Sequence, residues 1–134
     1  YTPYKFQGLG RYPLDNPDQF DVYLPGFFWA SAFYRREPIN DRLLIPMDSR
    51  ATAGPTGIAE YAFFYQGGWS WVAPYLAGVY ALAAQADPKI TPERFWDIAM
   101  RTGRTNTLGH EGKLYALGPI VDPAAIIVEL KKQP

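Results

Sequence analysis

A serine stands between two tryptophans in the stretch GGWSWVAPYLAG, residues 67–78. Gly67 and Gly68 interrupt an aromatic run, and an uncharged, alanine-rich segment follows, which places Ser70 where a turn passes into a helix. The first N–H groups of a helix have no acceptor within it, and the helix dipole there favours negative charge. Such donors stabilise the oxyanion that forms when a serine attacks a carbonyl carbon. Ser70 is therefore a candidate nucleophile, and the simpler alternative is a serine that only caps the helix.

The residues around this serine resemble the nucleophile signature of subtilisin-like serine proteases (subtilases), G-T-S-M-A-[ST]-P-H-[VI]-A-G. Gly68, Ser70, Pro74, Ala77 and Gly78 fall in register with it. The α/β-hydrolase elbow G-x-S-x-G fails because a valine stands at its second glycine. Similarity continues through LLIPMDS, ALAAQADPKITPERFWDIAMRTG and ALGPIVDPAAII. The resemblance implies an α/β fold, with a parallel sheet and a buried helix that starts at the nucleophile.

Residues 43–134 are accordingly interpreted as the C-terminal part of a subtilisin-like peptidase domain. The resemblance implies that Ser70 attacks a peptide or protein substrate and forms an acyl-enzyme, with its own N–H as one oxyanion donor. Gly68 and Trp69 would then lie beside the substrate. Trp69 stands where the family has threonine. This bulky residue either narrows the leaving-group side of the cleft or marks a degenerate site.

The rest of a catalytic triad is the missing element. A subtilase has its aspartate and histidine ahead of the serine, whereas the one histidine here, His110, follows Ser70 in a predicted loop. The family's oxyanion asparagine also precedes the serine, and Asn16 and Asn40 occur in irregular, surface-like sequence. Because the sequence begins with Tyr1 rather than methionine, we expect these groups in an N-terminal part of the domain outside this chain, and an inactive isolated chain.

Two other functional interpretations stay open. One is a catalytically dead subtilase fold, a pseudoprotease or interaction domain, which the Trp-Ser-Trp setting favours. The other is an independent small domain in which Ser70 only caps a helix. A half-domain would leave a sheet edge and apolar surface uncovered, so self-association of the purified chain is a further expectation.

Composition restricts the partners. The 134 residues carry 13 Lys+Arg and 13 Asp+Glu, a formal net charge of zero, which argues against nucleic acid and anionic membranes as obligatory partners. The absence of cysteine excludes disulfides and thiolate metal sites. The longest uncharged stretch contains two adjacent glycines and a proline, and reads as strand, turn and helix rather than a membrane span. The cellular compartment stays open, although many subtilases are secreted.

No cofactor is expected apart from a candidate calcium site. Asp15, Asn16, Asp18 and Asp21 carry ligand oxygens, but their spacing departs from the EF-hand pattern. The alternative is a turn with solvated carboxylates.

The elements that position the serine follow from periodicity and capping. Residues 1–42 have closely spaced prolines and are predicted to be irregular, as an insertion of the protease domain, and residues 27–35 are either a short helix or a short strand. A helix over residues 70–86 is apolar on all sides, which predicts complete burial and a close approach of another element at Gly78. Thr91 and Asp122 each precede a proline and are predicted N-caps of two further helices.

The remaining predictions concern strands, a loop and two clusters. Asp48 and Arg50 are a candidate ion pair near the serine. Residues 43–45 and 59–66 are predicted strands, and residues 102–118 are a predicted loop with a short strand near 113–116. The aromatic residues assigned to the core are Phe27, Phe28, Trp29, Phe33 and Tyr34.

Overall fold

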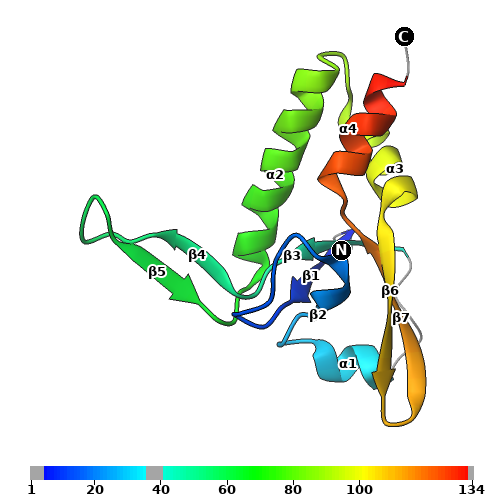
Figure 1. The fold of residues 1–134 in the computed structure, drawn as a ribbon. Coiled ribbons are helices and arrows are strands. Elements are labelled where there is room, and N and C mark those ends of the chain that lie inside the picture. Colours follow the sequence, from blue (N-terminus) through cyan, green and yellow to red (C-terminus); the bar gives the residue numbers. More distant parts are fainter. Residues whose placement is uncertain (1–4, 36–40, 133–134) are drawn as a thin grey trace.

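A five-stranded mixed sheet lies between helices in the computed structural model, which describes residues 5–35 and 41–132. This architecture confirms the predicted α/β class. Figure 1 shows α2, α3 and α4 on one side of the sheet and the short α1 on the other. In chain order the elements are β1 (Phe6–Gly10), a 3-10 turn η1 (Phe20–Val22), β2 (Leu24–Pro25), α1 (Ala30–Arg35), β3 (Leu43–Pro46), β4 (Arg50–Ala53), β5 (Tyr61–Phe64), α2 (Trp69–Ala86), α3 (Pro92–Thr102), β6 (Arg104–His110), β7 (Lys113–Ile120) and α4 (Pro123–Lys131).

The strand order is β2-β1-β3-β7-β6. The three central strands are parallel, whereas β2 and β6 run antiparallel at the two edges, so the expected parallel sheet describes only the centre. Strand β3 is buried along its whole length, as its continuous apolar run predicts. Because side chains alternate, Leu43 and Ile45 face the core shared with α2, α3 and α4, while Leu44 faces the core on the α1 side.

The prediction of an irregular segment over residues 1–42 is wrong for the strand β1. This strand pairs with β3 in parallel register, with Gln7 opposite Leu44, and its residue Leu9 is fully buried. Gly8 is a residue that strands disfavour. The fold requires glycine at this position, because a Cβ there would lie 2.2 Å from the Met47 sulfur. In the aromatic cluster, Trp29 and Phe33 belong to the core as predicted, whereas Phe28 is half exposed.

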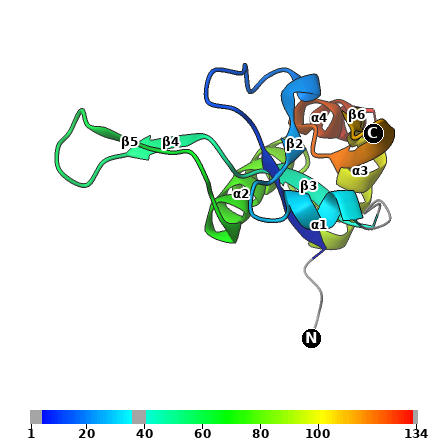
Figure 2. The same ribbon diagram turned by 90° about the horizontal axis from the view of Figure 1, so that it is seen from below.

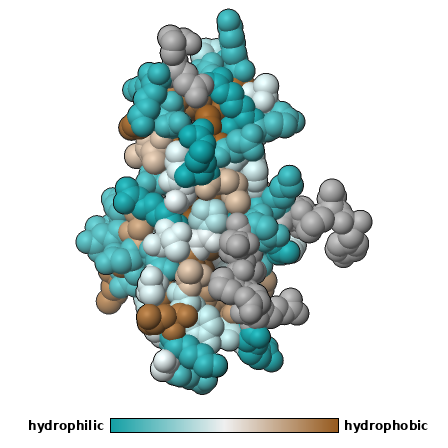
Figure 3. All heavy atoms as spheres, turned by 90° about the vertical axis from the view of Figure 1, so that its right-hand side faces the viewer, coloured by the Kyte–Doolittle hydropathy of each residue, from teal (hydrophilic) through white to brown (hydrophobic). Residues whose placement is uncertain are grey.

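Strands β4 and β5 form a separate two-stranded ribbon. Figures 1 and 2 both show it projecting away from the rest of the molecule. Figure 3 shows the side on which α3, α4 and the β6–β7 hairpin lie, where hydrophobic atoms form small groups separated by hydrophilic side chains. Among the helices of the described residues, none combines the length and apolar character needed to cross a membrane.

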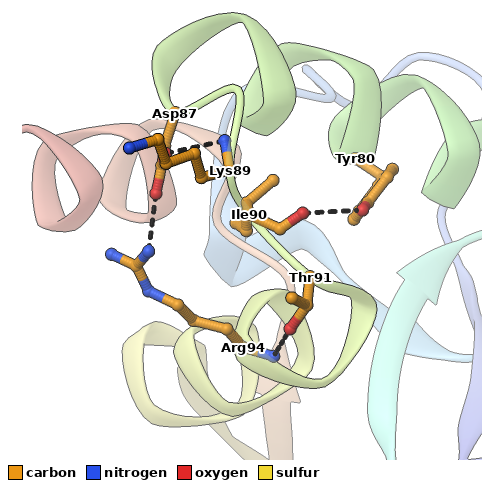
Figure 4. A network of polar contacts seen from close by, with 6 residues as sticks. All are labelled: Tyr80, Asp87, Lys89, Ile90, Thr91 and Arg94. Carbon is orange, nitrogen blue, oxygen red and sulfur yellow. Dashed lines mark hydrogen bonds and ion pairs between the residues drawn. The ribbon is translucent and has the colours of Figure 1, made fainter.

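Helices α3 and α4 begin at the predicted caps. The Thr91 hydroxyl accepts from the Arg94 N–H at 3.2 Å, and the Asp122 carboxylate accepts from the Ala125 N–H at 3.0 Å. Figure 4 shows the turn that joins α2 to α3, where Arg94 forms a 2.6 Å ion pair with Asp87. These contacts hold α3 against the end of α2.

Helix α2 begins at Trp69, within one residue of its predicted start, and ends at the predicted Ala86. The prediction of complete burial is wrong: Val72, Val79 and Ala83 are buried, while the opposite face is exposed. A Cβ added at Gly78 would meet no described atom within 4 Å, so the expected close approach is absent there. Apolar residues around the whole circumference of α2 are therefore covered on one side only.

The loop predicted over residues 102–118 is instead largely the β6–β7 hairpin, and the short strand expected near 113–116 lies within β7. The turn of the hairpin uses Glu111 and Gly112, which have φ angles of 48° and 75°. Strand β6 is mostly polar, which suits an exposed edge strand, whereas β7 is largely apolar and buried toward its end. Asn106 shows how the hairpin is attached: its amide donates to the backbone oxygens of Phe20 and Tyr23. The polar sequence around Asn106 does not predict this contact, because its partners are more than 80 residues away.

Alkaline pH is expected to destabilise the fold through Tyr23. Burial, together with the nearby Tyr75, raises the pKa of Tyr23 to about 12. Between its ordinary pKa of 10.0 and about 12, the unfolded chain loses the phenol proton while the folded chain keeps it. The free energy of unfolding should therefore fall over this interval, by about 2–3 kcal/mol for the whole shift. Urea unfolding at a series of pH values measures the slope.

Tyr23→Phe provides the control for this prediction. It removes the titrating group and its 2.9 Å hydrogen bond to the Pro17 oxygen, so it lowers stability at neutral pH by about 1 kcal/mol. Its alkaline slope should be shallower than that of the wild type. Equal slopes in the two proteins would contradict the assignment.

Candidate active site at the start of helix α2

Asp48 organises the turn that leads into α2. Its buried carboxylate accepts two backbone hydrogen bonds, from the Gly67 N–H at 2.7 Å and from the Phe27 N–H at 2.8 Å. Gly67 is also packed tightly, because a Cβ there would lie 2.4 Å from the Met47 carbonyl oxygen. Met47 and Asp48, which directly follow β3, therefore hold this turn in place. The predicted Asp48–Arg50 ion pair is wrong, since Arg50 lies instead 5.2 Å over the Tyr75 ring.

Ser70 is the second residue of α2 and does not cap the helix. The N-cap is Gly68, whose carbonyl accepts from the Trp71 N–H at 2.9 Å. The interpretation of Ser70 as an N-cap is therefore wrong. Ser70 is exposed, and within residues 5–35 and 41–132 no group hydrogen-bonds to its hydroxyl. Its N–H belongs to the first turn of the helix, where backbone donors have no acceptor within the helix.

The two tryptophan side chains beside Ser70 pack against different parts of the molecule. Trp69 donates from its indole N–H to the Gln7 side-chain oxygen on β1 at 2.9 Å. The Trp69 ring also lies edge-on to the Phe28 ring, with centroids 6.5 Å apart. Trp71 packs against Phe64 of β5, with centroids 4.9 Å apart. Ser70 is exposed, with the neighbouring Trp69 hydrogen-bonded to the sheet and the neighbouring Trp71 packed against the β4–β5 ribbon.

His110 is not placed to act on Ser70. It ends β6, where its ring stacks on Tyr34 with centroids 3.9 Å apart and lies 3.9 Å from the Glu111 carboxylate. In Figure 1 the tip of the β6–β7 hairpin and the first turn of α2 lie in different parts of the molecule. Asn16 is occupied in a turn, where its side chain accepts from the Asp18 N–H at 3.0 Å. Asn40 lies outside the described residues.

The candidate calcium ligands do not form a cluster. In the part of the chain that the structure describes, no three His, Cys, Asp or Glu side chains are placed to hold a metal ion together. The buried guanidinium of Arg11 donates to the backbone oxygen of Asp15 at 2.5 Å. A fixed positive charge beside this segment is unfavourable for a divalent cation.

An apolar groove of about 360 Å³ begins one turn beyond Ser70 and follows α2 toward α3. It shares Ala73 and Ala77 with the exposed side of α2. Its lining is almost entirely hydrocarbon and aromatic: Phe6, Ala73, Leu76, Ala77, Tyr80, Pro92, Phe95 and Trp96.

The sequence places Ser70, Gly68 and Trp69 in one turn. It does not reveal that Asp48 holds this turn through Gly67, or that Gln7 accepts a hydrogen bond from Trp69. The signal for Asp48 was its place at the end of a buried strand, where a carboxylate needs partners. Gln7 offered no signal, because it is separated from Trp69 by 62 residues.

Comparison with known proteins found no matching family model, curated protein or solved structure.

Proposed function

We propose that this chain is the nucleophile-bearing part of a subtilisin-like serine endopeptidase that cleaves peptide bonds through an acyl-enzyme on Ser70. The exposed Ser70 hydroxyl at the start of an 18-residue helix carries this proposal. Support also comes from the match of the surrounding residues to the subtilase signature. The catalytic aspartate, histidine and oxyanion asparagine belong to an N-terminal part of the domain outside these residues.

The chemistry assigned to this chain is limited to the attack and to oxyanion stabilisation. The Ser70 oxygen adds to the scissile carbonyl carbon while a base takes its proton. The resulting oxyanion is stabilised by the Ser70 N–H and by the positive end of α2. The amine leaves with a proton from the same base, and water then releases the acid product.

The exposed side of α2 supports a partner of the kind that this function requires. The groove along α2 and α3 is almost entirely apolar and lies one turn beyond Ser70. In this proposal the N-terminal part of the domain packs there and brings its histidine to Ser70. No metal or organic cofactor is needed for the reaction.

Fluorophosphonate labelling tests the proposed function. The 134-residue chain alone should remain unlabelled, because a serine hydroxyl needs a base within hydrogen-bond reach. The longer protein that contains the N-terminal part should be labelled, and peptide mass mapping should place the label on Ser70. Rapid labelling of the chain alone would contradict the missing-base interpretation.

The catalytically dead alternative predicts a different result. In that case the longer protein carries aspartate and histidine in subtilase settings and still does not react. The bulky Trp69 and Trp71 side chains beside Ser70 would then cause the lack of reaction. If Trp69 blocks access of the probe to the Ser70 hydroxyl, Trp69→Thr should restore labelling.

A further inference from the structure

The β4–β5 ribbon has two chemically different faces. Arg50, opposite Phe64 in the register, lies on the inner face, where Phe64 packs on Trp71 and the Arg50 guanidinium lies over Tyr75. Side chains alternate along a strand, so the neighbouring positions point to the outer face. That face carries Ala51 and Ala53 of β4 and Tyr61 and Phe63 of β5.

The outer face is exposed and uncharged. Tyr61 is 80% exposed and Phe63 is 53% exposed, and both alanines are exposed as well. At the loop end, Ile58 is completely exposed, and Glu60 is the single charged residue between positions 51 and 68. Ordinary protein surface, such as the side shown in Figure 3, has its hydrophobic groups separated by polar ones. The outer face lacks this separation.

The ribbon is also weakly supported by the molecule itself. An isolated two-stranded ribbon is marginally stable in water and needs packing on one face to persist. In the described residues β4 and β5 pair only with each other, so both outer backbone edges lack a strand partner. Contacts with the body occur at the base, through Trp71, Tyr75 and the Ser49 N–H bonded to the Tyr65 oxygen at 2.9 Å.

We propose that the outer face of the ribbon packs against the same face of a second copy of the chain, in a two-fold symmetric dimer. An uncharged face is best matched by another uncharged face, and a copy of the ribbon provides one of identical size. The formal net charge of zero means that two chains approach without long-range repulsion. Face-to-face packing of two ribbons also supplies the second layer that each one lacks.

The available area predicts a weak dimer. The exposed fractions of Tyr61 and Phe63, with the loop and alanine surface, correspond to on the order of 400–500 Å² per copy. Two copies bury twice this area, which is at the lower limit for a specific interface. The dissociation constant is therefore expected in the micromolar range. Sedimentation velocity of the 134-residue chain should show a monomer–dimer equilibrium over about 1–200 µM.

Matched variants on the two faces test the proposal. Phe63→Glu places a charge in the interface and should raise the dissociation constant at least about tenfold. Thr52→Glu adds the same charge to the inner face of the ribbon and should leave the dissociation constant within about threefold of wild type. Circular dichroism of both variants checks that the chain still folds. An equal loss of dimer in the two variants, or a monomer at every concentration, would overturn the proposal.

The absence of cysteine offers an independent test. Ala51→Cys or Ala53→Cys should cross-link two chains through a short bismaleimide, because both positions face the partner. Thr52→Cys, between them on the opposite face, should give little cross-linked product. If neither alanine position exceeds Thr52→Cys, the two copies associate elsewhere, for example along α2, and the ribbon proposal fails. Neither experiment depends on Ser70 or on catalysis.

Discussion

Under the proposed function, replacing Ser70 with alanine in a longer protein that contains the catalytic base is expected to lower kcat/KM for peptide hydrolysis by about 10⁶-fold. The loss is this large because the covalent pathway disappears, and only substrate binding and the oxyanion donors still act. Stability should be almost unchanged, within about 0.5 kcal/mol, since the Ser70 side chain is exposed and its hydroxyl bonds to no described residue. Steady-state hydrolysis of a peptide substrate and urea unfolding measure the two effects.

Ser31→Ala is the matched control for this variant. Ser31 is also an exposed serine near the start of a helix, here α1. Its replacement should leave both hydrolysis and stability unchanged. Full hydrolysis by the Ser70→Ala variant would show that Ser70 is not the nucleophile, and it would remove the basis of the proposed function.

Gly67→Ala is expected to lower the free energy of unfolding by about 2–4 kcal/mol. The added Cβ would lie 2.4 Å from the Met47 carbonyl oxygen and 3.0 Å from the Trp71 ring. Because a backbone oxygen cannot move aside alone, the turn must shift, and the 2.7 Å hydrogen bond from the Gly67 N–H to Asp48 is strained or lost. Urea or thermal unfolding of the chain gives the magnitude.

The neighbouring glycine separates crowding from simple loss of flexibility. A Cβ at Gly68 would meet no atom of the described residues within 4 Å, and the residue has extended backbone angles that alanine adopts. Gly68→Ala should therefore cost about 1 kcal/mol or less, mainly as a poorer N-cap. A cost as large as that of Gly67→Ala would show that the contact with Met47 is not the cause.

Interactions between residues close in the chain could be predicted. Thr91 and Asp122 cap α3 and α4 because each accepts from an N–H three residues ahead. The apolar run of β3 implies burial on both faces wherever the strand lies. The glycine pair before Ser70 implies a turn into a helix. Each of these features depends on a few consecutive residues, which the sequence contains in full.

Local interpretation failed where a distant segment supplies the stabilising contacts. Residues 102–118 look like a loop because their first half is polar, but most of them form a hairpin that Asn106 attaches to the backbone oxygens of Phe20 and Tyr23. Strand β1 falls in the segment predicted to be irregular because of the closely spaced prolines that follow it, and its partner β3 is more than 30 residues away. In both cases the partner is tens of residues away.

The sequence by itself determined the α/β class, the start and caps of the later helices, and the position of Ser70 in the first turn of α2. Only the tertiary structure decided what surrounds that serine. Asp48 fixes the turn from 19 residues away, and Gln7 anchors Trp69 from 62 residues away. These hydrogen-bonded pairs form because the sheet brings distant segments together. Burying a polar group costs free energy, and the hydrogen bond to its distant partner offsets this cost. The exposed side of α2 has the same origin, since an apolar helix surface is buried only where another element reaches it.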